Sequence, residues 1–152
     1  MSIGATTAID PAQAHRHRLR VRYGETDQMG VAHHGSYVGW FEVARIEWLR
    51  DLNLSYKAME AEGVFLPVTH LSIRYRRSAR FDEVLEVETR LVELGVCRVA
   101  IDNRLTRPAD GEVLAEARIE LAAVGAEGRV RRLPDPIHAI LTRHLCAPAT
   151  TT

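Results

Sequence analysis

The segment from residue 23 to residue 37 gathers the side chains that could do chemistry. It holds two carboxylates, Glu25 and Asp27, two adjacent histidines, His33 and His34, and three glycines. A carboxylate in such a segment can act as a general base or as a nucleophile. If a helix begins where the segment ends, its unpaired N–H groups can bind an anion or polarise a carbonyl oxygen. The segment is therefore the first candidate site, and its glycines let a ligand approach the backbone closely.

The elements that position this segment are predicted to be a strand before it and a helix after it. Residues 16–23 alternate between arginine and His, Leu, Val or Tyr, which is the period of a half-buried strand. From Tyr37 to about Leu52, large apolar residues recur at spacings of three and four, which predicts a helix packed against a sheet, with Ser36 as its N-cap. The residues on its apolar face are Tyr37, Trp40, Phe41, Ala44, Trp48 and Leu52.

The remainder of the chain is predicted to be one short helix, a run of strands and a short terminal helix. A helix segregated from a run of antiparallel strands is typical of an α+β fold. The second helix lies between Ser55 as N-cap and Gly63 as the residue after its C-cap. The later elements are strands over 71–76, 84–91, 97–105 and 113–121, a turn at 108–111, a short strand near 129–133 and a helix over 136–145.

Composition indicates one globular domain. The 152 residues are 46% hydrophobic and 26% charged, which excludes a mostly disordered chain. We expect the domain to span residues 15–145, with flexible segments over 1–14 and 146–152. The net charge of zero argues against a nucleic-acid partner or an anionic membrane surface. Neither a membrane-spanning run nor a signal-peptide pattern is present in the sequence, so a cytoplasmic location is expected.

Cysteine and histidine usage indicates neither disulfides nor a metal site. Cys97 and Cys146 are too few for a disulfide framework, and Cys97 is expected to be a small core residue. Adjacent His33 and His34 tend to face opposite sides, and no third ligand follows at useful spacing. We therefore expect no metal and no cofactor.

Three segments resemble the hotdog-fold acyl-CoA thioesterases, in particular the 4-hydroxybenzoyl-CoA thioesterase-like group that includes bacterial thioesterases associated with the Tol-Pal system. The similarity covers about residues 16–124, with later matching segments at 42–50 and 75–87. The opening motif consists of Thr26-Asp27, Gly30-Val31, His34 and Ser36-Tyr37.

The resemblance implies a hotdog fold, in which an antiparallel sheet wraps around one long helix, and hydrolysis of an acyl-CoA thioester. Asp27 matches the catalytic carboxylate, which either attacks the thioester or activates water. The peptide N–H of His34 matches the group that polarises the carbonyl. Taken alone, Asp27 could equally be a loop cap, and Glu25 is more simply a solvated or ion-paired acid.

Further residues are expected to contact the substrate. Gly30, Val31 and Tyr37 belong to the opening motif, and Thr69 lies in a stretch that can border the acyl pocket in the family. Arg76 and Arg77 belong to the densest basic cluster, whose other members are Arg74 and Arg80. Arginine suits the three phosphate groups of coenzyme A.

The basic cluster also has a simpler interpretation, as a solvated strand face balanced by nearby acids. Lys57 is the only lysine among the 20 basic residues, and a GC-rich coding bias explains that count best. Ser78 stands where the family usually has proline, which affects the shape of the connection that carries the cluster. Glu42 and Glu47 are expected to be interface or ion-pair groups, with Glu47 able to pair with Arg50.

The resemblance also implies assembly and leaves two other functions open. A sheet with open edges invites pairing across a two-fold axis, and the family implies a homodimer with sites at the subunit interface, assembling to a homotetramer. The alternatives are a non-catalytic module that binds acyl thioesters and a hotdog-fold hydratase or dehydratase. The hydration motif of the latter group is not found in this sequence.

Overall fold

The computed structural model describes residues 14–146. The two segments that the sequence predicts to be flexible therefore lie outside the described residues, except for Ala14 and Cys146. In chain order the elements are β1 (His15–Arg20), the 3-10 helix η1 (Tyr23–Glu25), α1 (Ser36–Asp51), α2 (Tyr56–Ala61), β2 (Val68–Tyr75), β3 (Val84–Leu94), β4 (Arg98–Arg107), β5 (Glu112–Ala122) and α3 (Asp135–Thr142).

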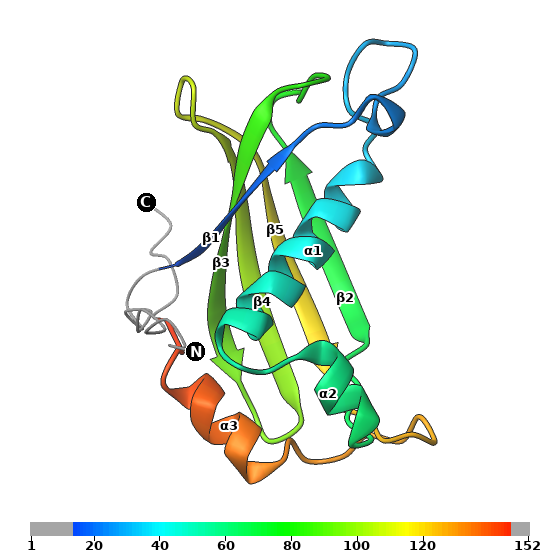
Figure 1. Cartoon of the computed structure of the whole chain (residues 1–152), viewed down its shortest axis with the longest axis vertical. Coiled ribbons are helices and arrows are strands. Elements are labelled where there is room, and N and C mark those ends of the chain that lie inside the picture. Colours follow the sequence, from blue (N-terminus) through cyan, green and yellow to red (C-terminus); the bar gives the residue numbers. More distant parts are fainter. Residues whose placement is uncertain (1–13, 147–152) are drawn as a thin grey trace, which may run out of the picture.

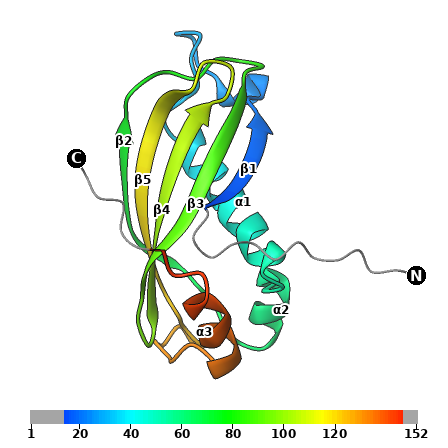
Figure 2. The ribbon, with the colours of Figure 1, turned by 90° about the vertical axis from the view of Figure 1, so that its left-hand side faces the viewer.

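The strands form one antiparallel sheet, which curves around α1. Their order is β1-β3-β4-β5-β2, so β1 and β2 are the edges. Figure 1 shows α1 crossing the sheet, and Figure 2 shows that it lies on one side only. The segment that follows β1 emerges at the end of the sheet where α1 begins, which brings the candidate site to that end. The predicted α+β class is thus confirmed.

Helix α1 buries the apolar face that the sequence predicts. Trp40 and Trp48 are each 4% exposed, and Phe41 and Ala44 are fully buried. Beneath them lie alternating strand residues such as Leu85 and Val87 of β3, also fully buried. Burial of each such side chain contributes about 1.5–3 kcal/mol, so this packing holds the start of the helix against the sheet.

The beginning of α1 differs from the prediction by one residue. Gly35 is the N-cap, and Ser36 is the first helical residue. The hydroxyl of Ser36 donates 2.9 Å to the carbonyl oxygen of Glu25 instead of capping its own helix. A contact to a residue far back in the chain has taken over the side chain that the local pattern assigned to the cap.

Three other predictions needed correction. Tyr23 is 77% exposed, because β1 ends at Arg20 and the chain turns into the 3-10 helix. The region 129–133 forms an isolated bridge, between Val124 and Val130, and a few single backbone hydrogen bonds, so it is not a strand. Cys97 is half-buried rather than a core residue.

The remaining predicted elements are present, several with shifted ends. Ser55 caps α2 by accepting from the N–H of Ala58 at 3.3 Å. Gly63 follows the C-cap with φ +79°, a conformation that favours glycine. The predicted terminal helix is α3. Within the described residues, no helix is long and apolar enough to cross a membrane.

Candidate active site

Asp27 begins a tight turn that orients its carboxylate. Its N–H donates to the carbonyl of Val31 at 2.9 Å, and its own carbonyl accepts from the N–H of Gly30 at 3.0 Å. The side-chain oxygen Oδ1 accepts from the N–H of Met29 at 2.9 Å. No hydrogen bond or ion pair within residues 14–146 involves Oδ2. The loop-cap interpretation therefore accounts for one oxygen, and the other is left for chemistry.

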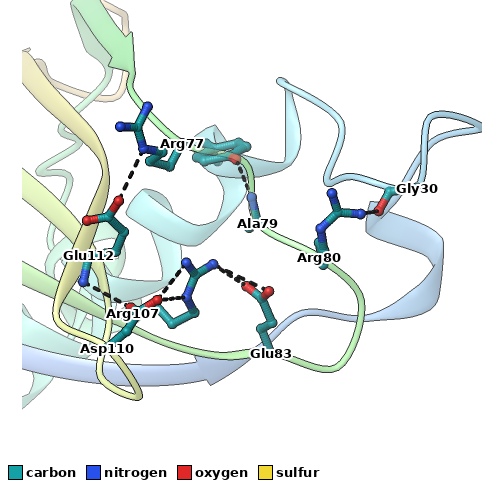
Figure 3. A network of polar contacts seen from close by, with 9 residues as sticks. Gly30, Arg77, Ala79, Arg80, Glu83, Arg107, Asp110 and Glu112 are labelled. Atoms are coloured by element: carbon teal, nitrogen blue, oxygen red, sulfur yellow. Dashed lines mark hydrogen bonds and ion pairs between the residues drawn. The ribbon is translucent and has the colours of Figure 1, made fainter.

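Gly30 and Val31 act on this turn through their backbones. Gly30 has φ +78°, where a side chain would be strained. Its carbonyl lies 3.5 Å from Nη1 of Arg80, a contact that Figure 3 shows reaching across from the connection between β2 and β3. One residue beyond the turn, Thr26 and Ala32 form a bridge that closes the loop. Asp27 thus lies in a short loop that this bridge closes.

The N–H of His34 is unpaired just before α1. Its neighbours are engaged: the N–H of His33 donates to the carbonyl of Glu25 at 2.8 Å, and that of Ser36 donates to the carbonyl of His33 at 2.9 Å. The N–H of Gly35 donates to Nδ1 of His33 at 3.1 Å. Within the described part of the chain, nothing accepts from the N–H of His34. A free donor at a helix start can bind a developing oxyanion.

Two tyrosines support this peptide from the sheet side. The hydroxyl of Tyr75 on β2 donates 2.7 Å to the carbonyl oxygen of His34. Tyr37 packs edge-on against Tyr75, with ring centroids 4.9 Å apart, and its hydroxyl accepts from the N–H of Ala79 at 3.2 Å. Burial raises the pKa of both hydroxyls above their ordinary value. Both phenols therefore stay protonated at neutral pH and serve as hydrogen-bonding groups, not as bases.

Sequence reasoning missed the role of Tyr75. Its alternation with Leu71 and Ile73 predicts a core position, but β2 is an edge strand and Tyr75 is 46% exposed. The interaction with His34 joins residues 41 positions apart, and no local pattern reports such a contact.

The imidazole rings of His33 and His34 lie against each other at the surface. Their centroids are 4.1 Å apart, with the planes tilted by 34°. Nδ1 of His33 is already an acceptor for Gly35. Among the described residues, no group of three or more His, Cys, Asp and Glu side chains is arranged to hold a metal ion.

The predicted phosphate-binding arginines lie beside the site and carry ion pairs. Nη2 of Arg76 lies 2.8 Å from Glu116, and Nε of Arg77 lies 3.1 Å from Glu112. Both arginines line an open cavity of about 480 Å³ at the end of β2 and the start of β5. Tyr75 lines the same cavity, which connects it to the peptide of His34.

A second arginine network stabilises the neighbouring turn. Arg107 lies between Glu83, at 3.2 Å, and Asp110, at 2.8 Å, as Figure 3 shows. The hydrogen bond from Arg107 holds the pKa of Asp110 below its ordinary value. In the same connection, Ala79 donates to Tyr37 and accepts from the N–H of Ala32 at 2.7 Å. The connection from residue 76 to residue 83 is thereby bound to both the loop and α1.

Thr69 is the one predicted site residue that this chain does not bring to the others. It lies near the start of β2 and donates to the carbonyl of Glu120 at 3.2 Å. Tyr75 ends the same strand, and a strand rises about 3.3 Å per residue. Thr69 is therefore roughly 20 Å from the end of β2 that meets the loop.

Helix α1 carries the predicted surface ion pair away from the loop. Arg50 and Glu47 approach to 2.7 Å on its exposed side. Glu42 is exposed. Neither acid lies on the buried face that packs against the sheet.

Comparisons with known proteins match most of the chain. The model of the thioesterase-like superfamily matches residues 21–141. The acyl-CoA thioester hydrolase YbgC of Escherichia coli is 34% identical over 122 residues, covering 80% of this chain and 90% of that protein.

Two solved structures share the architecture. A hypothetical protein from Thermus thermophilus is 41% identical with a TM-score of 0.80, covering 84% of this chain and 96% of that one. The DHNA-CoA thioesterase of Staphylococcus aureus is 31% identical with a TM-score of 0.80, covering 84% of this chain and 88% of that one. The expected hotdog architecture is confirmed.

Proposed function

Because the chain belongs to the thioesterase-like superfamily, we propose that it hydrolyses an acyl-coenzyme A thioester to a carboxylic acid and free coenzyme A. The family and the enzyme class, thioester hydrolase, agree with the expectation from the sequence. The observation that carries the proposal is the combination, in one closed loop, of two groups that have no partner within residues 14–146: a carboxylate oxygen of Asp27 and the N–H of His34.

These two groups meet the minimum that the reaction needs. The His34 N–H stabilises the negative charge that develops on the thioester oxygen, an effect worth on the order of 3 kcal/mol per donor. Asp27 either removes a proton from the attacking water or attacks the carbonyl carbon itself. A carbon–oxygen bond forms, the carbon–sulfur bond breaks, and the thiolate leaves and takes up a proton. The thioester is already activated, so the proposed step uses neither metal nor cofactor.

An isotope experiment separates the two roles of Asp27. In a single turnover in ¹⁸O-water, activation of water puts the label into the released acid. Direct attack makes an anhydride with Asp27, and if water then attacks the aspartyl carbonyl, the first acid released carries an unlabelled oxygen from Asp27. Mass spectrometry of the acid and of the loop peptide reads both outcomes.

The cavity beside Arg76 and Arg77 supports a coenzyme A substrate. It opens next to Tyr75, and the two guanidinium groups retain exposed surface despite their ion pairs. Phosphate groups accept bidentate hydrogen bonds from arginine. We assign Arg76 and Arg77 to the phosphates of coenzyme A, with the pantetheine arm running past Tyr75 toward the His34 peptide.

A second copy of the chain would complete the site. No described strand pairs with the outer edge of β2, and pairing of two β2 edges around a two-fold axis would be antiparallel. Such pairing directs the Thr69 end of one β2 toward the Tyr75 end of the other. We propose a homodimer on this edge, able to assemble further to a homotetramer, and sedimentation analysis tests it.

The deciding experiment is a thiol-release screen over aliphatic and aromatic acyl-CoA substrates. Wild type is compared with Asp27→Asn, and with Asp51→Asn as a matched control at the far end of α1. We expect release by wild type and by the control, and almost none by Asp27→Asn. Tight binding of acyl-CoA by wild type without any thiol release would contradict hydrolysis and favour the non-catalytic binding module.

A further inference from the structure

The carboxylate of Glu25 is held from both sides. Its Oε2 accepts from Nε1 of Trp40 at 2.7 Å, and its Oε1 accepts from the N–H of Arg22 at 2.7 Å. The side chain is only 15% exposed. Short hydrogen bonds to a carboxylate are among the stronger hydrogen bonds in proteins. Glu25 thus differs from Asp27, two residues later, whose Oδ2 has no partner within the described residues.

The backbone of Glu25 also holds the segment around His34. Its carbonyl oxygen accepts from the N–H of His33 at 2.8 Å and from the hydroxyl of Ser36 at 2.9 Å. The unpaired N–H of His34 therefore lies between two residues that are both fastened to one oxygen atom. Any displacement of Glu25 must move this N–H, or break the contacts on either side of it.

Trp40 fixes this arrangement to the hydrophobic core. The indole is 4% exposed and packs against Tyr37, with ring centroids 4.8 Å apart. It lies one turn into α1, which the sheet holds in place. The bond from the indole to Glu25 therefore links the core-packed part of α1 to the loop that carries Asp27.

We infer that Glu25 is a positioning residue, whose bonds to Trp40 and Arg22 set the separation between the Asp27 carboxylate and the His34 N–H. The inference rests on the proposed hydrolase function. It assigns no contact with substrate to Glu25, because both of its oxygens already accept short bonds. A displacement of about 1 Å at reacting groups can reduce a rate by roughly 100-fold, so a loop anchor of this kind affects kcat directly.

Glu25→Gln is the primary test. The amide has the same shape but only one acceptor oxygen, so its NH2 group must face one of the two N–H donors and that bond is lost. We expect kcat to fall about 10- to 100-fold while KM changes little, because the phosphate contacts are elsewhere. The far-ultraviolet circular dichroism should match that of wild type.

Trp40→Phe tests the same link from the other side. It removes the indole donor, leaves most of the ring, and should lower kcat in the same direction. In the double variant Glu25→Gln/Trp40→Phe, the glutamine NH2 group no longer faces an indole N–H. The fold-decrease in kcat of the double variant should therefore be smaller than the product of the decreases in the two single variants. Trp48→Phe is the matched control, since Trp48 lies on the same helix without a bond to Glu25, and its kcat should be close to that of wild type.

Fluorescence gives a readout apart from activity. Trp40 and Trp48 are the only tryptophans, so Trp40 is the sole emitter in Trp48→Phe. Adding Glu25→Gln should shift the emission of Trp40.

Absence of thiol release by wild type would contradict the proposed function. An active wild type with full kcat in Glu25→Gln would overturn the positioning role alone. Loss of activity in Glu25→Gln with wild-type kcat in Trp40→Phe would also overturn it, because Glu25 would then act on the substrate directly.

Discussion

The outer face of the sheet and the loop before α1 differ in how far their polar groups are paired. On the outer face, acids and bases meet across neighbouring strands: Glu86 of β3 lies 2.8 Å from Arg16 and 3.1 Å from Arg18. In the loop, the Oδ2 atom of Asp27 and the N–H of His34 have no partner among the described residues. Glu86 on the outer face is fully engaged by its neighbours, whereas Oδ2 of Asp27 has no such partner within residues 14–146.

This difference supports the proposal that the loop, and not the outer face, acts on a ligand. Polar groups that can pair in a folded protein generally do so, because an unsatisfied group loses free energy when water is removed. The loop is dense in hydrogen bonds, and Oδ2 of Asp27 and the N–H of His34 are among its groups for which the described residues supply no partner. The outer face needs nothing more and is expected to affect stability alone.

Removal of the free acceptor gives the largest effect. In Asp27→Asn the amide oxygen can still accept from Met29, so the turn and the fold should persist. We expect kcat for thiol release to fall roughly 1,000-fold, within the range of a lost general base. Measurement of kcat checks the loss of activity, and circular dichroism checks that the fold persists. An undiminished kcat would place the chemistry elsewhere.

Weakening the support of the free donor gives a smaller loss. Tyr75→Phe removes the hydrogen bond to the carbonyl of His34, and one such bond contributes about 0.5–1.5 kcal/mol. We expect kcat to fall about 3- to 10-fold, with little change in KM. Tyr23→Phe is the control, since Tyr23 is 77% exposed and its hydroxyl has no partner among the described residues. Equal kcat in the two variants would refute the support by Tyr75.

Arg76 and Arg77 combine features of both regions. Each carries an ion pair, as on the outer face, and each also lines the cavity beside the loop. Arg77→Ala should raise KM for acyl-CoA several-fold and leave kcat nearly unchanged. The same variant should use an acyl-pantetheine substrate, which lacks the nucleotide, as well as wild type does. A matching loss with both substrates would show that Arg77 acts on the fold and not on phosphate.

The outer face gives the smallest effect, confined to stability and to acid pH. Burial raises the pKa of Glu86, but the bonds from Arg16 and Arg18 outweigh it and hold the pKa below its ordinary value. A lowered carboxyl pKa stabilises the fold above the unfolded pKa, and this stability is lost as the pH falls through the folded value.

Arg18→Ala tests this assignment. It should reduce the free energy of unfolding at pH 7 by about 1 kcal/mol or less, and the difference from wild type should shrink below pH 4. Urea unfolding at pH 7 and pH 3 measures both values. The kcat of thiol release should not change, and a clear loss of kcat would remove the distinction between the regions.

Much of the fold could be predicted because buried apolar residues recur at regular spacings along a helix or a strand. The spacing of Trp40, Phe41, Ala44 and Trp48 predicts α1, and strict alternation predicts β3, β4 and β5. These patterns report which face of an element is covered. The strand expected near residue 129 was wrong because Arg129-Val-Arg-Arg-Leu133 is too short a pattern to separate a strand from a loop.

The site was predictable only in part. Asp27 and His34 followed from a motif, and their free atoms agree with the expected roles. The bonds that hold them could not be predicted, since Tyr75, Ala79 and Trp40 reach the loop from separate elements. Thr69 shows the reverse case: it was expected at the acyl pocket, this chain leaves it near the other end of β2, and the proposed dimer would bring the Thr69 of a second copy near the site.

The contacts that close the loop also determine when it can form. The loop is synthesised early, but Tyr75 and Ala79 follow it by more than forty positions, and β1 pairs with β3 through His15 and Thr89. Contacts between residues so distant in sequence form late, because a long stretch of chain must first be ordered. On the ribosome, Asp27 and His34 leave the exit tunnel well before β2 and β3. The nascent chain is therefore expected to stay inactive until those two strands have emerged.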